Sequence, residues 1–419
     1  MASSSASTAK QGTPYRPGKS SSASNKERGF AINYIGSKLS LLPAIREILS
    51  AHKVGPGVFC DLFSGTSIVA QMARLEGHTV LSNDWQVYSF VMQQAYIAND
   101  GYPAFSELLT RVPDIAKADV NLPRPVVGLA KDPGYREDTW PLRRVLAYLE
   151  TLPHKVGPFF QSYCAGGEAA RKYFSAENGM LAESIRTQIE IWRSAGWLTD
   201  GEWALLVATL LETMDHLANT ASVYGAYLKK LKKSAQASLR LRLLSLPSAD
   251  GKPHRCFRQD GVKLLETLAE RREMIDVLYL DPPYNHRQYH ANYHVLETLA
   301  RWDLQQFTPR GKTGLRPGDE QRSPFCSRRE VTQAFQDVLN AAQARHILVS
   351  YNNEGLLKEN DLKQLLSQKA RGGPTDFRCF PYKRFRADVD SHNRRYQVDE
   401  VREFLFYIRV NPEREESVL

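Results

Sequence analysis

The 419-residue chain is predicted to fold as an α/β protein with a doubly wound mixed sheet and a mainly helical insertion. Two observations predict the sheet: short apolar runs alternate with stretches of helical periodicity, and several of these runs end in an acid. A third predicts the insertion, because helical periodicity replaces the strand-like runs over residues 101–254. We therefore expect one core built from residues 29–100 and 255–419.

Composition is that of a soluble globular protein, with 42% hydrophobic and 24% charged residues. No apolar run approaches the roughly 18–20 residues that span a bilayer, and the opening stretch lacks the apolar centre of a signal peptide. The five cysteines form no Cys-x-x-Cys pair, which favours reduced thiols and argues against structural zinc. A net charge of +9 suits a polyanionic partner, although charge alone supports this only weakly.

Residues 1–28 are rich in Ser, Ala and Lys without periodicity, which predicts a disordered leader. A Gly-Ser-Lys loop ending at Lys38 then opens a helix that places Leu42, Ile45 and Leu49 on one face. A lysine and free N–H groups at a helix start can hold a carboxylate.

The next unit is a strand at 58–61, a glycine-containing turn at Gly65 and a helix to Leu75. Glycine lets the backbone approach a ligand closely, yet the turn is neither Gly-x-Gly-x-x-Gly nor a Gly-Lys-Ser/Thr phosphate loop. A second strand ends at Asp84, roughly 20 residues after the turn, where a carboxylate can bind ribose hydroxyls. Trp85 or a neighbour is placed to flank an adenine ring.

Within the insertion, residues 173–192 and 202–216 show helical periodicity. Residues 227–242 form a basic run that we interpret as a basic helix. Such a helix is either a solvated face or, given the interleaved tyrosines, a surface for a polyanion. The sequence leaves both interpretations open.

The sheet pattern resumes with a strand that ends at Asp260 and a helix over 261–272. The apolar strand 277–280 must stop at Asp281, because the two prolines that follow cannot donate to a ladder. Asp84, Asp260 and Asp281 thus follow three strands, and in a doubly wound sheet such ends share one edge. Later strands are expected at 346–352 and 403–408.

Asp281-Pro282-Pro283-Tyr284 combines an acceptor, a rigid turn and an aromatic ring. The amino group of a planar base needs an acceptor that aligns its lone pair and a ring on which the base stacks. The Asp281 carboxylate and the Pro282 carbonyl supply the acceptors, and Tyr284 supplies the ring. The prolines stiffen the turn, so little has to be ordered on binding.

Together these stretches resemble the motifs of S-adenosylmethionine-dependent N6-adenine DNA methyltransferases of the Dam-like alpha group. The resemblance covers residues 30–100 and 255–410 and implies a Rossmann-like methyltransferase core, with the insertion as the target-recognition part. The matching stretches, in family order, are Tyr34 to Lys38, Asp61 to Thr66, Asn83-Asp84, Asp260, and Asp281 to Tyr284 with the run that follows to Glu297.

The resemblance implies three sets of site residues. The catalytic set is Asp281, Pro282, Pro283 and Tyr284. The set implied to bind S-adenosylmethionine is Tyr34, Gly36, Ser37, Lys38, Asp61, Phe63, Ser64, Gly65, Thr66, Asp84, Asp260 and Asp281. The set implied to contact the DNA substrate is Tyr284, Asn285, Arg287, Tyr289, Lys383, Arg384 and Arg386, of which the last three are equally well explained as a solvated basic loop.

The implied function is site-specific methylation of a flipped adenine at N6 in double-stranded DNA, in a restriction-modification or phage system. A cognate restriction endonuclease is the implied partner, and the cytoplasm of a bacterial or phage-infected cell is the implied location. The recognition sequence and the oligomeric state stay open.

Two alternatives remain. In the first alternative the methyl acceptor is an amine in RNA or cytosine N4, although Asp at the first position of the catalytic motif is typical of enzymes that act on adenine in DNA. In the second alternative the chain is a non-catalytic DNA-binding relative of this family, although the catalytic tetrad Asp281 to Tyr284 is intact.

No metal is expected. His286, His290 and His294 are spaced by four as on a metal-binding helix face, but no carboxylate completes a site and the implied reaction requires no metal. One departure from the family concerns Ser67, where a second glycine is common. We expect a negative φ at Ser67 and unimpaired cofactor binding.

Overall fold

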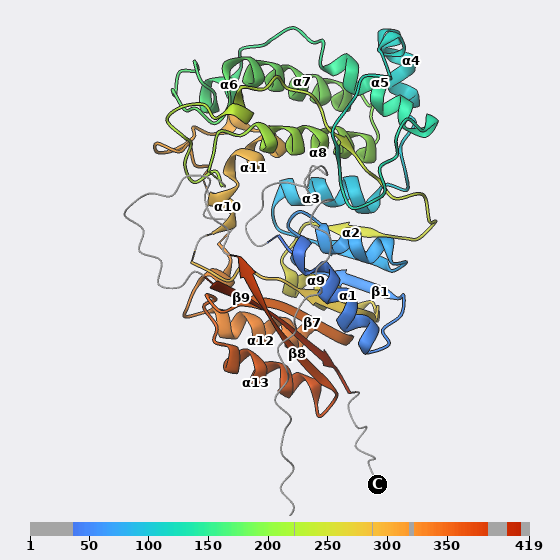
Figure 1. Cartoon of the computed structure of the whole chain (residues 1–419), viewed down its shortest axis with the longest axis vertical. Coiled ribbons are helices and arrows are strands. Elements are labelled where there is room, and N and C mark those ends of the chain that lie inside the picture. Colours follow the sequence, from blue (N-terminus) through green and yellow to red (C-terminus); the bar gives the residue numbers. More distant parts are fainter. Residues whose placement is uncertain (1–36, 222, 287, 318–321, 384–399, 412–419) are drawn as a thin grey trace, which may run out of the picture.

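The computed structural model describes residues 37–411 except 222, 287, 318–321 and 384–399, so the predicted leader lies outside the described residues. Its centre is a seven-stranded sheet (Figure 1). Five neighbouring strands are parallel, and the last two form an antiparallel hairpin at one edge. This is the predicted mixed α/β sheet. In spatial order the strands are β5 (Arg255–Phe257), β2 (Thr79–Asn83), β1 (Val58–Asp61), β6 (Ile275–Leu280), β7 (Ala344–Asn352), β9 (Glu400–Arg409) and β8 (Thr375–Lys383).

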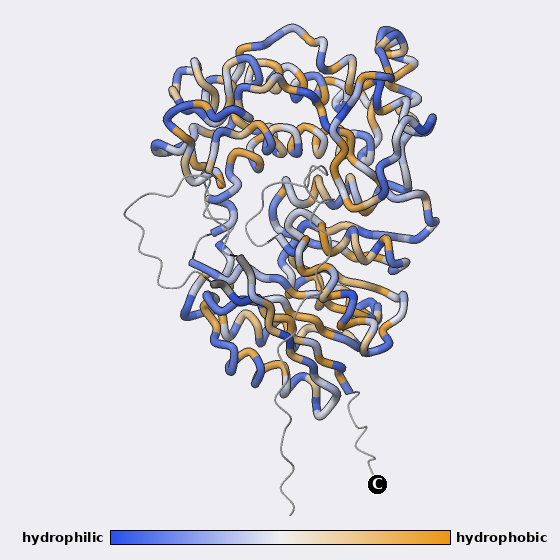
Figure 2. Tube along the Cα trace, in the orientation of Figure 1, coloured by the Kyte–Doolittle hydropathy of each residue, from blue (hydrophilic) through white to orange (hydrophobic). Residues whose placement is uncertain are grey.

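Both faces of the sheet are covered by helices, which makes its central strands apolar throughout. Alternate residues of one strand point to opposite faces: Phe59 packs with α1 (Leu42–Ala51) and α2 (Ile68–Leu75), and Cys60 packs with α9 (Gly261–Glu270). The helices α12 (Val331–Ala341) and α13 (Glu359–Ala370) cover the same face as α9. Figure 2 shows hydrophobic residues gathered along the strands between these layers.

Above the sheet in Figure 1 lies a layer of helices from the insertion. Its two long helices lie where they were predicted, as α7 (Ala176–Ser194) and α8 (Asp200–Leu217). A capping box between Thr199 and Glu202 fixes the start of α8. The smaller elements are α4 (Ser106–Arg111), α5 (Trp140–Leu149), α6 (Pro158–Tyr163) and a two-stranded sheet of β3 (Val126–Val127) and β4 (Leu243–Leu244).

A helix from the second half of the core, α11 (His294–Arg301), joins this helical layer to the sheet. Buried Arg186 of α7 donates to the last carbonyls of α11, Leu299 O at 2.8 Å and Ala300 O at 3.0 Å. Buried Glu297 of α11 accepts from the first N–H groups of α3 (Val87–Gln93). Each terminus is thereby capped by an opposite charge, which complements the helix dipole.

The basic run 227–242 is not a helix, contrary to the prediction. It is an extended chain with one 3-10 turn at Lys233–Gln236. Leu239 and Leu241 are buried while Arg240 between them is exposed, an alternation typical of extended chain. Buried Asn219 holds the run by accepting from Lys232 N and donating to Leu228 O, both at 2.9 Å.

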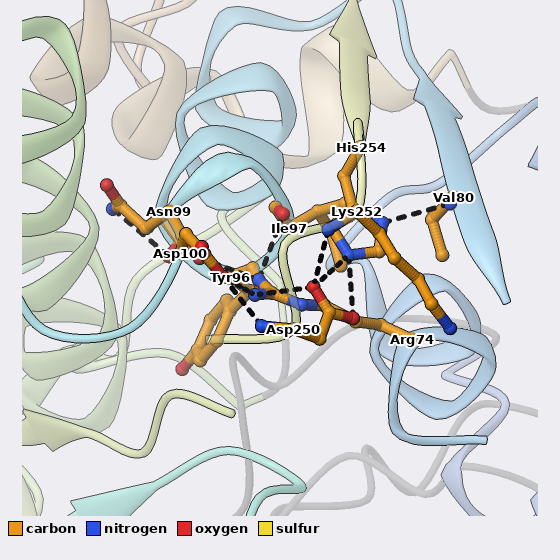
Figure 3. A network of polar contacts seen from close by, with 10 residues as sticks. Arg74, Val80, Tyr96, Ile97, Asn99, Asp100, Asp250, Lys252 and His254 are labelled. Carbon is orange, nitrogen blue, oxygen red and sulfur yellow. Dashed lines mark hydrogen bonds and ion pairs between the residues drawn. The ribbon is translucent and has the colours of Figure 1, made fainter. Parts of the chain in front are cut away.

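Arg74 of α2 anchors the chain where it leaves the sheet for the insertion (Figure 3). Its Nη1 donates to the carbonyls of Tyr96, Ile97 and Asn99 at 3.0, 2.9 and 2.7 Å. These carbonyls end the π-helical turn Gln94–Ala98, so the guanidinium satisfies acceptors that the helix leaves open.

The returning chain is fixed at the same place. Asp250 N donates to Asp100 Oδ1 at 2.9 Å, and the Asp250 carboxylate contacts His254 Nε2 at 3.1 Å (Figure 3). The other ring nitrogen of His254 accepts from Val80 N of β2 at 3.0 Å. The neutral imidazole therefore bridges the sheet edge and the end of the insertion.

In the part of the chain that the structure describes, no helix is long and apolar enough to cross a bilayer.

Acid is expected to destabilise the fold through His254. Burial is the largest cause that lowers the pKa of His254 in the folded chain, so between the folded and unfolded pKa values the unfolded state binds more protons. The stabilisation by neutral His254 is complete above the unfolded value of about 6.5 and is lost as pH falls below it. Urea unfolding at pH 8 and pH 5.5 measures the difference.

In His254→Gln we expect a loss of about 1–2 kcal/mol at pH 8 and a shallower pH dependence. The exposed His154 gives the control His154→Gln, which keeps the wild-type profile. An unchanged pH slope in His254→Gln would contradict this assignment.

Candidate active site

A cavity of about 650 Å³ opens at the carboxyl ends of the parallel strands β1, β2, β5 and β6, where ligands bind in open α/β sheets. The three predicted strand-end acids, Asp84, Asp260 and Asp281, all line it. Their convergence was predicted from the sequence. The other predicted residues in its wall are Ser37, Lys38, Asp61, Phe63, Ser64, Gly65, Thr66, Pro283 and Tyr289.

The turn after β1 is shaped by backbone contacts to the next strand. Ser64 N donates to Asn83 O at 2.9 Å, and Gly65 N donates to Asp84 Oδ2 at 2.9 Å. Gly65 has φ +52°, a left-handed conformation that glycine adopts without steric cost. The Ser64 and Ser82 hydroxyls lie 2.6 Å apart beneath the turn.

Ser67 also lies in the left-handed region, with φ +62°, so the prediction of a negative φ was wrong. The residue is fully buried, and its hydroxyl has no hydrogen-bond partner among the described residues. The conformation persists because the turn is fixed on both sides: Ser67 N donates to Ser64 O at 2.7 Å, and Ser67 O accepts from Gln71 N at 2.8 Å. The chain therefore holds backbone strain beside the cavity.

Asp84 uses both carboxylate oxygens on backbone groups, Gly65 N and Gln86 N, each at 2.9 Å. Burial, the largest cause, raises the pKa of Asp84, and these hydrogen bonds oppose the rise. Asn83 was not predicted as a site residue, yet it donates to Leu62 O and Gln259 O and accepts from Gln259 N. It thus fixes the spacing of three loops around the cavity.

Asp260 caps α9, with its Oδ1 accepting from Val262 N at 3.0 Å and Lys263 N at 3.2 Å. The cap orients the acid at the cavity wall. Asp260 can therefore cap α9 and still face a ligand in the cavity.

Lys38 forms the electrostatic centre of the site. Its Nζ lies 3.0 Å from Asp281 Oδ1 and 3.8 Å from Glu403 Oε2, and the Lys38 and Glu403 side chains are 3% and 4% exposed. Burial alone would lower the pKa of Lys38, but the two carboxylates outweigh it and raise that pKa. Lys38 is therefore charged.

Asp281 follows β6 directly and faces two opposing influences. Burial, the largest cause, and the negative charge of Glu403 raise the pKa of Asp281, while Lys38 lowers it; the result is about 6. Asp281 is therefore mostly a carboxylate at neutral pH.

Asp61 lies deeper, at the end of β1, and is 1% exposed. Burial, the largest cause, and the charges of Asp281 and Asp84 raise the pKa of Asp61 to about 8, and Ser64 opposes this. Its Oδ1 is buried and has no hydrogen-bond partner in the described part of the chain. Such an atom beside a cavity suits a ligand that brings a cation or a donor.

The segment after Asp281 is held against the second half of the sheet. Tyr284 O accepts from Leu356 N at 3.0 Å, and the Tyr284 ring meets the Tyr351 ring edge-on at a centroid distance of 6.4 Å. Lys38 Nζ lies 5.8 Å from the centroid of Tyr284. The acid and the ring of the predicted tetrad therefore face the same cation.

The three histidines spaced by four do not share one face. His294 is buried, and its ring nitrogens lie 2.9 Å from Ala291 O and from Thr313 O, whereas His286 is exposed. Burial is the largest cause that lowers the pKa of His294. Among the residues that the structure describes, no three His, Cys, Asp or Glu side chains are grouped as a metal site requires.

The remaining predicted residues either do not line the cavity or lie outside the described residues. Lys383 ends β8, and its side chain is not described. Pro282 is buried and Asn285 is half-buried, and neither lines the cavity. Tyr34, Gly36, Arg287, Arg384 and Arg386 lie outside the described residues.

Glu403 was missed as a site residue by sequence reasoning. The available signal was an acid at the start of the apolar run expected as a strand, 403–408, because burying an acid there is costly unless it is paired. Gln288 was missed too; it exchanges hydrogen bonds with the Ser323 backbone at the cavity wall, at 2.9 and 3.3 Å.

Comparison with known proteins gives a consistent result. The model of the D12 class N6 adenine-specific DNA methyltransferase family matches residues 34–121 and 171–365. The chain is 37% identical over 378 residues to the type II methyltransferase M.NlaIII of Neisseria lactamica, covering 89% of this chain and 98% of that protein. It is 31% identical over 387 residues to the type II methyltransferase M.CviAII of Paramecium bursaria Chlorella virus 1, covering 90% and 98%.

A third relative is longer than this chain. The type II methyltransferase M.FokI of Planomicrobium okeanokoites is 34% identical over 381 residues, which are 90% of this chain but only 52% of that protein. The chain therefore spans about half of M.FokI. No solved structure matches the chain.

Ser67→Gly is expected to stabilise the protein by about 1 kcal/mol, because it removes left-handed strain and a buried hydroxyl at some cost in unfolded-state entropy. Urea unfolding measures the change. Ser194→Gly at the exposed, right-handed end of α7 is the matched control and should destabilise by about 0.5–1 kcal/mol. Equal losses in both variants would show that Ser67 is not strained.

Proposed function

The chain belongs to the D12 class N6 adenine-specific DNA methyltransferase family, and we propose that it transfers a methyl group from S-adenosylmethionine to N6 of a flipped adenine at a specific site in double-stranded DNA. The observation that carries the site assignment is the Asp281 carboxylate, held by buried Lys38 in the cavity at the strand ends. The family match supports adenine N6 in DNA over an RNA acceptor, cytosine N4 or a non-catalytic role.

The donor side of the cavity fits S-adenosylmethionine. The glycine turn brings the backbone to the wall, Asp84 stands one strand further along, and Asp61 presents a buried oxygen without a protein partner. Asp61 suits the cationic methionine end of the cofactor, and Asp84 and Asp260 suit its nucleoside end. Bound there, the cofactor supplies an electrophilic methyl group on a sulfonium.

The acceptor side is formed by Asp281 to Tyr284. The Asp281 carboxylate and the Pro282 carbonyl accept from the amino group and turn its lone pair towards the donor, while Tyr284 stacks on the base. Positive charge develops on N6 during transfer, and fixed acceptors stabilise it without reorganising. Flipping the base costs a few kcal/mol, offset by stacking and hydrogen bonds in the pocket.

Recognition of the DNA is assigned to two parts of the chain. We assign contacts with the flipped nucleotide and its phosphates to Asn285, Arg287 and Tyr289, which follow the tetrad in the sequence, and to the basic residues Lys383, Arg384 and Arg386. The helical insertion, 101–254, is assigned to reading bases in the duplex. A cognate restriction endonuclease is the proposed partner, in keeping with relatives that are named type II methyltransferases.

Asp281→Ala is expected to lower methyl transfer at least about 100-fold, since one fixed acceptor typically contributes a factor of 100 to 1,000. The measurement is incorporation of tritiated methyl into DNA, followed by nucleoside analysis for N6-methyladenine. Cofactor binding, measured by calorimetry, is expected to survive. Retained transfer would refute the role of Asp281, and label in another nucleoside would refute the acceptor.

The rate is expected to fall in acid. Asp281 must be ionised to accept from the amino group, and its pKa is raised to about 6, chiefly by burial. For the free enzyme, kcat/KM should therefore be level above about pH 7 and fall about tenfold per pH unit well below 6. A profile that stays level to pH 5 would contradict this, once circular dichroism has shown that the protein remains folded.

A further inference from the structure

A second buried carboxylate, Glu403, stands behind the ion pair of Lys38 and Asp281. It lies in β9, between Asn352 of β7 and Phe380 of β8, and its side chain is 4% exposed. Its Oε2 lies 3.8 Å from Lys38 Nζ and has no hydrogen-bond partner among the described residues. A buried acid so far from water needs a reason to stay charged, and Lys38 provides it.

The groups that face Asp281 come from every surrounding element. They are Lys38 before α1, Asp61 at the end of β1, Tyr279 in β6 and Glu403 in β9, and Tyr284 faces Lys38 in turn. Lys38 is the one cation in this set. In the ligand-free chain Asp61 is mostly protonated at neutral pH, because burial raises its pKa to about 8. Lys38, Asp281 and Glu403 together therefore leave one net negative charge.

That charge matters for the reaction assigned above. With Asp281 alone, Lys38 would form a neutral pair, and its ammonium would oppose the positive charge that develops on the target nitrogen. With Glu403 present, the ammonium is already compensated. The Asp281 carboxylate then acts on the amino group with its negative charge largely uncancelled, in a site where water screens little.

We propose that Glu403 is a positioning residue for methyl transfer: it compensates and holds Lys38, so that the Asp281 carboxylate presents net negative charge to the target amino group. Glu403 itself touches neither the acceptor nor the donor in this scheme. It acts through Lys38. The proposal rests on the function proposed above and extends the site to the antiparallel edge of the sheet.

The test is Glu403→Gln, which keeps size and removes charge. We expect kcat to fall about tenfold or more, with KM for DNA and cofactor within about twofold of wild type. Removing a negative charge that faces Asp281 lowers the pKa of Asp281, so the acid limb of kcat/KM should shift to lower pH. A purely structural role would cost stability and leave that limb in place, which would overturn the proposal.

Three further variants sharpen the result. Glu403→Asp keeps the charge and should retain the wild-type acid limb with a smaller loss of kcat. Glu403→Met removes the charge with an apolar chain of similar volume and replaces the glutamine variant if that does not fold. Glu270→Gln, at an exposed position in α9, is the matched control and should change neither kcat nor the acid limb.

A readout without turnover separates this proposal from the proposed function. Carbon-13 NMR of carboxyl-labelled aspartate follows the titration of Asp281, assigned by Asp281→Asn. In Glu403→Gln the Asp281 titration should move to lower pH. An unmoved titration overturns the role of Glu403 whatever the activity, whereas a wild-type protein that methylates no DNA overturns the proposed function.

Discussion

The structure around the cavity depends on one buried ammonium. Lys38 precedes α1, Asp281 follows β6 and Glu403 lies in β9, so a single cation connects the start, the middle and the end of the described chain. Charges in such a place are costly unless they are paired. Because each partner needs the others, the loop before α1, the turn after β6 and the antiparallel edge are held in one arrangement.

Buried charged side chains also connect the helical layer to the sheet. Buried Glu297 of α11 accepts from the N–H groups at the start of α3. Buried Arg186 of α7 donates to the carbonyls at the end of α11. Buried Arg74 likewise donates to the carbonyls of the turn that leads into the insertion. Helix ends that are closed by buried charges give rigid connections between the helical layer and the sheet.

Features of the fold that depend on residues close together in the sequence could be predicted from the sequence. Two prolines end β6 at Leu280 and leave Asp281 at the sheet edge, and strand-ending acids converge because parallel strands share that edge. The predictions were wrong where contacts with distant parts of the chain override the backbone conformation that the local sequence favours. Ser67 adopts a left-handed φ because contacts on both sides fix the turn, and residues 227–242 extend because Asn219 takes their backbone groups.

The sequence by itself determined the order of the core strands, the acids that face the cavity and the proline turn that follows Asp281, because periodicity and proline chemistry act between near neighbours in the chain. Only the tertiary structure decided which charges meet. Lys38 and Glu403 are far apart in sequence, and nothing local relates an acid in an apolar strand to a lysine at a distant helix start. Their pairing follows from burial, which makes an isolated charge too costly to keep.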